Sequence, residues 1–333
     1  MTATTPRPSS LAAHSARSRG WRIGLVAAKL AVFAACVWWL ASRSDPRAVL
    51  YRLKDIDAAT LTVIYALALV SIVILALRWR RIVERLGHAL SYAEALRLTF
   101  ICIFFNQLLP SGVGGDGMRI LGLTRQGMRT GSAFVSVLAD RIAGLAVLLL
   151  VLLPTLPTLA ALDHGKTTAA LIAAVVAALW AGLLLLRFTP AVMWLARLPF
   201  LGFLRHADQA ARNILRGAGD WLWLAAVSVP IQLIPCVIVW LLARDLGAGV
   251  SFGAATISVL LALMVGVLPI TIGSWGVRES ILAGVLTAQG CGADAALAIT
   301  LGYASTLLVS AGIGGCVWLV GRRPGASRSS ASG

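Results

Sequence analysis

Apolar residues along this chain gather in runs long enough to cross a lipid bilayer, and polar residues gather in the short segments between them. A spanning helix needs about 20 mostly apolar residues. Six runs predict full transmembrane helices, at residues 22–41, 60–77, 132–153, 168–186, 221–243 and 298–320. Two further apolar regions, 93–131 and 252–290, contain proline and glycine near their middle, which interrupt a helix. The pattern predicts an all-α polytopic membrane protein.

The composition agrees with a membrane protein and excludes an ordinary soluble domain. Of the 333 residues, 59% are hydrophobic and 13% are charged, with a mean hydropathy of +0.87. A soluble domain carries roughly 25% charged residues. In a soluble chain, the net charge of +16 at pH 7 would suggest a nucleic-acid partner. Here the arginines lie beside apolar runs, as in cytoplasmic loops, so we expect no nucleic acid and a multi-pass protein of the cytoplasmic membrane.

The positions of the arginines indicate how the two interrupted regions lie in the membrane. With the N-terminus in the cytoplasm, the second predicted helix returns to the arginines of 78–85. If region 93–131 enters and leaves on that side, Arg125 and Arg129 are also cytoplasmic, as the positive-inside rule requires. A full crossing by 93–109 would place both outside. We therefore expect two re-entrant hairpins, about six full transmembrane helices, and cytoplasmic N and C termini.

The interrupted regions share a sequence phrase, LPSGVGGDGMR at 109–119 and LPITIGSWGVRE at 268–279. An offset of 159 residues aligns proline with proline, two glycines with two glycines, and Arg119 with Arg278. Three full crossings lie between the hairpins, so the second enters from the opposite side and the pair forms an inverted repeat. Such repeats with broken apolar segments are typical of the midplane site of a transporter. The expected breaks lie at Pro110, Gly112, Gly114, Gly115, Gly117, Pro269, Gly273 and Gly276.

The broken phrases predict a site for an anion. A helix that restarts after the glycines directs its N–H groups and its positive dipole end into the site. Arginine adds a full charge and a fork that matches phosphate. An arginine at the bilayer centre costs roughly 2.5–3.5 kcal/mol, so two at equivalent positions need a reason. The expected ligands of a lipid phosphate are Arg119, Arg141, Arg278, Asn106 and Gln107. Asn106 and Gln107 can bond either the freed backbone or a headgroup, and close helix packing is the alternative reason for the glycines.

Three acidic residues lie in or near the apolar regions: Asp116, Asp140 and Glu279. Asp140 and Arg141 are neighbours in the sequence, and neighbours do not face each other on a helix. We expect Asp140 to pair with Arg119 or Arg278, and Arg141 to pair with Glu279 or with the phosphate. Two roles are open for the carboxylates: ion pairs that lock the helices together, and coupling of protons to transport.

Other chemistry finds little support in the sequence. Residues 112–117 match the pattern G-x-G-x-x-G, but no strand precedes them and no βαβ unit surrounds them, which excludes a dinucleotide fold. The five cysteines and four histidines show no metal-ligand spacing. We therefore expect no metal, no cofactor and no catalytic residues.

The chain is expected to form one transmembrane domain at residues 21–321, with repeat halves centred on 91–131 and 251–290. Residues 1–20 form a basic tail and residues 322–333 a second tail. Both tails are rich in Ser, Arg and Gly, which is typical of disorder.

Three stretches together resemble a known membrane family: FFNQLLPSGVGGDGMR, VLADRIAG and LPITIGSWGVRE. They are similar to the transmembrane region of lysylphosphatidylglycerol synthetase, also called the flippase-like or UPF0104 family, over about residues 20–320. The resemblance implies translocation of an anionic phospholipid or a polyprenyl-phosphate-linked lipid across the cytoplasmic membrane. Its motif positions are Asn106, Pro110, Gly114, Gly115, Arg119, Asp140, Arg141, Pro269, Gly273, Gly276, Arg278 and Glu279. The sequence shows no soluble aminoacyl-transferase domain, so lysine transfer is not expected.

Two other functions are open. One is an integral-membrane component of a system that makes aminoacyl- or glyco-lipids, with a separate lipid-modifying enzyme as its partner. The other is a membrane transferase or hydrolase that acts on a lipid phosphate, for which Asp116, Asp140 and Glu279 are the candidate acid–base groups.

Overall fold

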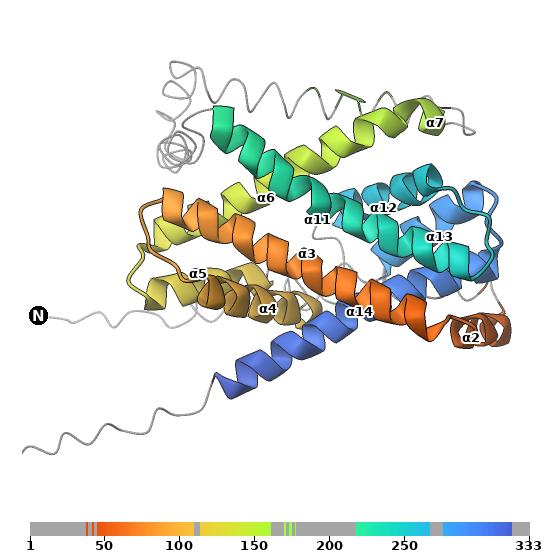
Figure 1. Ribbon diagram of the computed structural model, residues 1–333, viewed down its shortest axis with the longest axis horizontal. Helices are drawn as coiled ribbons and strands as arrows, with labels where there is room; N and C mark the ends of the chain where they lie inside the picture. The colour runs from red at the N-terminus through yellow and green to blue at the C-terminus, as the bar shows by residue number, and fades with distance from the viewer. Residues whose placement is uncertain are drawn as a thin grey trace, which may run out of the picture.

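The computed structural model describes residues 45–109, 114–160, 218–266 and 276–321, and the single positions 38, 42, 170, 173, 174 and 177. All elements in these segments are helices, which confirms the all-α prediction for the described part of the chain (Figure 1). They are α2 (Pro46–Lys54), α3 (Ala58–Arg85), α4 (Tyr92–Leu108), α5 (Gly114–Arg125), α6 (Thr130–Leu152), η1 (Leu153–Thr155), α7 (Leu156–Ala160), α11 (Ala218–Asp245), α12 (Phe252–Gly266), α13 (Val277–Ala288) and α14 (Ala293–Val320).

Four helices are long and apolar enough to cross a membrane: Ala58–Arg85, Thr130–Thr158, Leu222–Asp245 and Ala293–Val320. They coincide with four of the predicted spans, and the second of them runs from α6 through η1 into α7. The predicted spans 22–41 and 168–186 lie outside the described residues, apart from five single positions. The two predicted tails also lie outside them.

One face of α3 exposes apolar side chains. Val63, Val70, Val73 and Leu77 are each 40–46% exposed. Their spacing of seven, three and four residues places them on one side of the helix. An exposed apolar stripe on a helix of this length fits contact with lipid chains.

The two interrupted regions form helical hairpins, α4–α5 and α12–α13. In the first, Gln126 follows α5 and donates through Nε2 to Oε1 of Glu94, near the start of α4, at 3.0 Å. In the second, Gln289 follows α13 and donates through Nε2 to the carbonyl oxygen of Ala254, near the start of α12, at 3.3 Å. Each hairpin therefore begins and ends on one side of the molecule, and its re-entrant insertion into the membrane stays a prediction.

Local sequence explains where the hairpins begin and end. Ser91 caps α4, and Ser251 caps α12, because each hydroxyl accepts a bond from the backbone N–H three residues later. Gly127 and Gly290 follow the returning helices with φ of +90° and +92°, which glycine adopts without strain. The two hairpins are thus bounded by the same kinds of residue.

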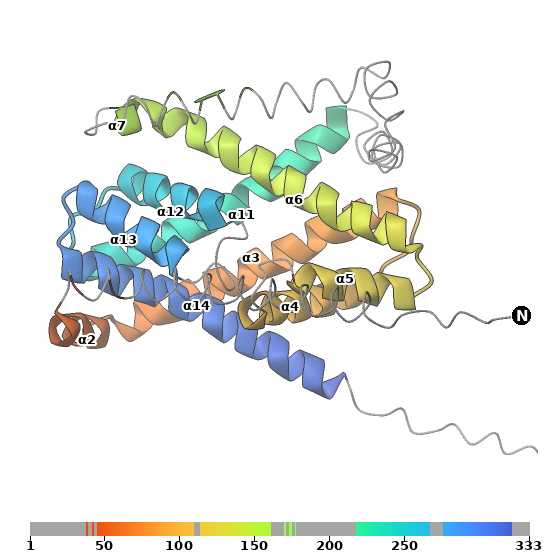
Figure 2. The ribbon, with the colours of Figure 1, turned by 180° about the vertical axis from the view of Figure 1, so that it is seen from behind.

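The hairpins open toward opposite ends of the molecule (Figure 1 and Figure 2). The opening of α4–α5 lies where α3 ends and α11 begins, and there Arg85 and Asp220 form an ion pair. The opening of α12–α13 lies where α11 ends and α14 begins. At that end the backbone N–H of Asp57 donates to Oδ2 of Asp245 at 2.9 Å.

The breaks themselves are described only in part. Four expected break residues lie outside the described residues: Pro110, Gly112, Pro269 and Gly273. Helix α5 begins at Gly114, and Gly115 and Gly117 lie in its first turn. A Cβ at Gly115 would overlap the carbonyl oxygen of Cys102, so this glycine serves close packing of α5 on α4. Gly276 precedes α13 with φ of +85°. The inverted repeat stays a prediction.

Two hydrophobic clusters flank the middle of α6. The larger cluster joins Leu149 and Leu152 of α6 to α3, α11, α12, α13 and α14. The smaller cluster lies under the first hairpin and includes Ala133 of α6. Asp140 and Arg141 lie on α6 between Ala133 of the smaller cluster and Leu149 of the larger cluster. The fold therefore places two charged residues between two apolar cores.

Candidate functional site

Residues of seven helices line a cavity of about 530 Å³: α3, α4, α5, α6, α11, α12 and α13. Leu75, Ile103, Leu148 and other apolar side chains form part of its wall. Among the described residues, its polar lining consists of Arg78, Cys102, Asn106, Gln107, Arg119, Asp140, Arg141, Gln232 and Arg278. Cavities of roughly 300–1,000 Å³ with an apolar wall and a few polar groups are the usual sites for small ligands.

All five residues predicted to bind a lipid phosphate line this cavity. Arg119 and Arg278 come from the returning helices of the two hairpins, Asn106 and Gln107 come from α4, and Arg141 comes from α6. The fold therefore brings the two arginines of the repeated phrase to one site. Phosphate binding itself stays a prediction.

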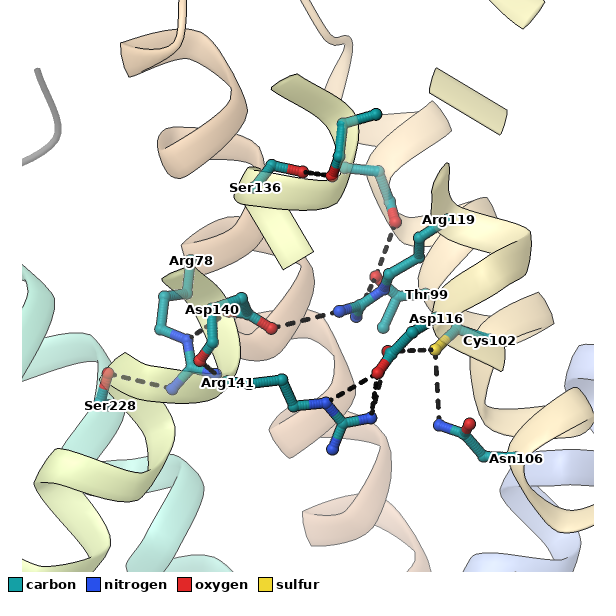
Figure 3. A network of polar contacts seen from close by, with 12 residues as sticks. Arg78, Thr99, Cys102, Asn106, Asp116, Arg119, Ser136, Asp140, Arg141 and Ser228 are labelled. Atoms are coloured by element: carbon teal, nitrogen blue, oxygen red, sulfur yellow. Dashed lines mark hydrogen bonds and ion pairs between the residues drawn. The ribbon is translucent and has the colours of Figure 1, made fainter. Parts of the chain in front are cut away.

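Asp140 is the centre of the polar network in Figure 3. Its buried carboxylate accepts from Nε of Arg78 at 2.8 Å and from Nη1 of Arg119 at 3.1 Å. The predicted pair between Asp140 and Arg119 is confirmed. One carboxylate thus ties α6 to both α3 and α5.

Arg78 was missed as a site residue by sequence reasoning. The apolar run predicts a helix that ends at residue 77, with Arg78 in a cytoplasmic loop. Helix α3 instead continues to Arg85, and the side chain of Arg78 is only 4% exposed. Besides Asp140, it donates through Nη1 to Oγ of Ser228 on α11 at 3.1 Å. The apolar residues Trp79, Ile82 and Val83, which continue the pattern beyond 77, were the available signal.

Arg119 is held on several sides. Nη2 donates to Oγ1 of Thr99 at 3.1 Å, and the guanidinium carbon lies 4.6 Å from the centre of the Trp79 ring, within cation–π range. Its Nε is buried and has no hydrogen-bond partner among the described residues. The side chain of Arg119 is 3% exposed, so its guanidinium group contacts protein atoms and very little solvent.

Arg141 differs from these arginines because 46% of its side chain is exposed, although it lies deep in α6 beside the cavity. Nε and Nη2 donate to Oδ2 and Oδ1 of Asp116 at 3.0 and 3.1 Å, so the pair is bidentate (Figure 3). The predicted pair with Glu279 is therefore wrong. Asp116, in the first turn of α5, contacts Arg141. Glu279 instead accepts hydrogen bonds at the start of its own helix, α13.

Glu279 caps α13 and neutralises its neighbour. Oε2 accepts from the backbone N–H of Gly276 at 2.8 Å, as in a capping box, and Oε1 accepts from Nε of Arg278 at 3.0 Å. Residues adjacent in sequence meet here because the carboxylate turns back toward the start of the helix. Of the two partners expected for Asp140, Arg119 is the one observed, and Arg278 contacts Glu279.

Asn106 forms a hydrogen bond with the backbone at the start of α5, which is one of the two roles expected for it. Oδ1 accepts from the backbone N–H of Gly115 at 2.9 Å, and Nδ2 donates to Sγ of Cys102 at 3.5 Å. One N–H at the start of α5 is therefore already satisfied. The positive charge of the site comes mainly from side chains.

The charges of the site do not cancel. Among the described residues, four arginines line the cavity, and three carboxylates hold them, namely Asp116, Asp140 and Glu279. The surplus positive charge lies on the two arginines that share Asp140. A surplus cation away from bulk water favours an anionic ligand. The described residues contain no group of three or more His, Cys, Asp or Glu side chains that could hold a metal ion.

Comparison with known proteins gives two matches. A family model described as "Lysylphosphatidylglycerol synthase TM region" matches residues 26–315. A relative described as "UPF0104 membrane protein" from Archaeoglobus fulgidus is 33% identical over 67 residues. That match covers 20% of this chain and 20% of the relative, so it spans about a fifth of the length of that protein.

Proposed function

Because the chain belongs to the family of the lysylphosphatidylglycerol synthase transmembrane region, we propose that it moves an anionic lipid between the leaflets of the cytoplasmic membrane. The cargo is an anionic phospholipid or a polyprenyl-phosphate-linked lipid. One observation carries the proposal: in the part of the chain that the structure describes, four arginines line one cavity among helices long enough to cross a membrane, and the three carboxylates that pair with them leave a net positive charge.

The lipid phosphate binds in the cavity while the chains stay in the bilayer. Guanidinium groups match phosphate in shape and charge. Arg141 makes the first contact, since its side chain is 46% exposed against 4% for Arg78 and 3% for Arg119. The surplus charge that Arg78 and Arg119 share at Asp140 adds attraction at short range.

Transport follows from the arrangement of the hairpins. They carry the repeated phrase, open at opposite ends, and each contributes one arginine, Arg119 or Arg278, to the cavity wall. This supports an inverted repeat in which one hairpin receives the phosphate from each side and passes it to the other. Six full spans and cytoplasmic termini complete the proposed topology, with the arginine-rich end of α3 in the cytoplasm.

A second candidate function has a specific observation in its favour, because the description of the matching family names a synthase. In that case the chain is the membrane component of a lipid-modifying system and acts with a separate enzyme. Purification of the chain from its native membrane in mild detergent, followed by incubation with lipid extract and mass spectrometry, distinguishes the two functions. A co-purified enzyme together with a new lipid product supports the second candidate, and unchanged lipids with measurable transport by the chain alone support the first.

The proposal is tested by reconstitution into vesicles of zwitterionic lipid that contain a trace of fluorescent phosphatidylglycerol. A membrane-impermeant quencher reports how fast the label in the inner leaflet becomes accessible. We expect the protein to accelerate this exchange for the anionic label and not for a matched phosphatidylcholine label. Equal rates for the two labels, or no acceleration by the protein, would contradict an anion-selective translocase.

A further inference from the structure

Gln232 brings a buried amide to the wall of the cavity from α11. It is 7% exposed, and it lies in a helix long enough to cross a membrane. A buried amide costs free energy unless its polar atoms find partners. One of the two polar atoms of this amide has a partner in the protein, and the other indicates what the cavity binds.

The orientation of the amide is fixed by a neighbour on α6. Nε2 of Gln232 donates to the carbonyl oxygen of Gly144 at 2.9 Å. The reverse orientation would place two acceptor oxygens against each other, so the nitrogen faces Gly144. No described residue donates to Oε1, and the buried polar atoms without a partner in the described part of the chain do not include it. Oε1 is therefore open to the cavity that Gln232 lines.

The backbone around Gln232 fits the wall of a polar cavity. Pro230 and Pro235 lie inside α11, on either side of Gln232. Each proline leaves the carbonyl four residues earlier without its usual N–H donor. In a membrane-spanning helix such carbonyls are tolerated where protein or a water-filled cavity surrounds them. The sequence thus places Gln232 in a stretch of α11 that requires polar surroundings.

Other oxygens of the cavity lining are already engaged. Oδ1 of Asn106 accepts from the backbone N–H of Gly115, and both carboxylate oxygens of Asp140 accept from arginines. The guanidinium groups of the site only donate, and they suit the phosphate. An ionised phosphodiester only accepts, so it does not satisfy Oε1 of Gln232. The partner of Oε1 is therefore a donor elsewhere on the ligand.

The position of Arg78 favours a donor without charge. Nη1 of Arg78 donates to Ser228, which lies about one turn before Gln232 on α11. A Cβ added to Gly144 would lie 3.4 Å from Nη2 of Arg78. The guanidinium thus lies beside the backbone that holds the amide. It would repel an ammonium group bound at Oε1, whereas a hydroxyl donates without charge.

We infer that Gln232 recognises a hydroxyl group of the lipid headgroup, while the arginines hold the phosphate. The cargo is then a phosphodiester whose headgroup carries a hydroxyl, as glycerol or a sugar does, and not an aminolipid. The inference rests on the proposed function and deepens it, because it names the class of cargo.

The test compares two lipids of equal charge in their binding to the full chain in nanodiscs of phosphatidylcholine. Dioctanoyl phosphatidylglycerol carries headgroup hydroxyls, and dioctanoyl phosphatidylethanol carries none. In calorimetric titrations, the wild type is expected to bind the first about 2- to 13-fold more tightly, the range for one neutral hydrogen bond. Dioctanoyl phosphatidylethanolamine tests the charge of the donor, and binding as tight as that of phosphatidylglycerol would overturn the choice of a hydroxyl.

Two variants assign the preference to Gln232. Gln232→Met removes the acceptor and keeps a side chain of similar length. It is expected to bind both anionic lipids with the affinity that the wild type has for phosphatidylethanol. Gln126→Met is the matched control, since Gln126 donates to Glu94 at the outer end of the first hairpin. The control is expected to keep the wild-type preference.

Three results would overturn the inference. One is equal binding of phosphatidylglycerol and phosphatidylethanol by the wild type, and another is a preference that persists in Gln232→Met. The third is a loss of affinity for both lipids in Gln232→Met, because a structural role then explains the effect. If Gln232→Met does not fold, Gln232→Ala takes its place, and failure of both to fold likewise assigns Gln232 a structural role.

Failure of the proposed function gives a different result. Glycerophosphoglycerol, which is the headgroup without lipid chains, is the third anionic probe. If it binds as tightly as the lipid and the vesicles show no transport, the ligand is a soluble phosphodiester. That result contradicts the translocase and leaves the role of Gln232 in place. Transport of anionic lipid with equal binding of phosphatidylglycerol and phosphatidylethanol contradicts the role of Gln232 alone.

Discussion

Nη1 of Arg119 lies 3.1 Å from Oδ2 of Asp140, and this ion pair joins the returning helix of the first hairpin to the membrane-spanning helix α6. Nε of Arg78, on α3, lies 2.8 Å from the other carboxylate oxygen. One buried carboxylate therefore holds three helices together and fixes two of the arginines that line the cavity.

Asp140→Asn is expected to destabilise the protein strongly, because it leaves two buried arginines without their counter-ion. Loss of one partner of a buried ion pair costs about 3–5 kcal/mol. Glu84→Gln is the matched control, since Glu84 pairs with Arg80 where both side chains are about one-third exposed. The control should change the free energy of unfolding by about 0–1 kcal/mol. Thermal unfolding in detergent micelles gives the comparison, and equal transitions for the two variants would contradict this account of Asp140.

Gly115→Ala is expected to disturb the packing of α5 on α4, whereas Gly117→Ala is not. A Cβ at Gly115 would overlap the carbonyl oxygen of Cys102, while a Cβ at Gly117 meets open space. Overpacking of this kind costs about 1–3 kcal/mol. Replacement of a helical glycine by alanine in open space gains up to about 1 kcal/mol. Unfolding temperatures of the two purified variants test the contrast, which fails if Gly117→Ala is the less stable protein.

The two hairpins are expected to be accessible from opposite sides of the membrane. Gln126 follows α5 and Ala288 ends α13, and both are near the openings of their hairpins. In a background without native cysteines, Gln126→Cys should react with an impermeant maleimide only from the cytoplasmic side. Ala288→Cys should react only from the other side. Labelling of both positions from one side would rule out hairpins that enter from opposite faces.

The repeated phrase and the positions of the arginines predict two helical hairpins and five of the residues that line the cavity. Re-entrant insertion of the hairpins and the inverted repeat stay predictions. The sequence signal is strong at these positions because helix breaks and charged side chains cost free energy in a bilayer, and they therefore point to a functional site. The sequence therefore predicts that Arg119, Arg141 and Arg278, from three separate helices, lie at one site, and all three line the cavity.

The pairing of the charges was predicted only in part: Arg119 was one of two expected partners of Asp140, whereas the partner of Arg141 was not predicted. Whether Asp116 or Glu279 reaches Arg141 depends on the rotation and depth of each helix, which a hydrophobic pattern does not define. Arg78 was missed because the boundary of α3 was placed at the end of the apolar run, about two turns before the helix ends. A helix can continue beyond the end of an apolar run, and an arginine in that continuation can be buried, as Arg78 is.

The central claim is that the cavity holds the phosphate of a transported lipid through Arg141. The most direct measurement is the rate of exchange of fluorescent phosphatidylglycerol in vesicles that contain the wild type, Arg141→Gln or Arg97→Gln. Arg97 lies at the outer end of the first hairpin and pairs with Glu94, so it is a matched arginine outside the cavity. Loss of a charged hydrogen-bond donor costs about 1.5–3 kcal/mol, which is roughly 10- to 150-fold. Such a loss in Arg141→Gln, with a wild-type rate in Arg97→Gln, is the predicted result; equal rates in all three proteins would contradict it.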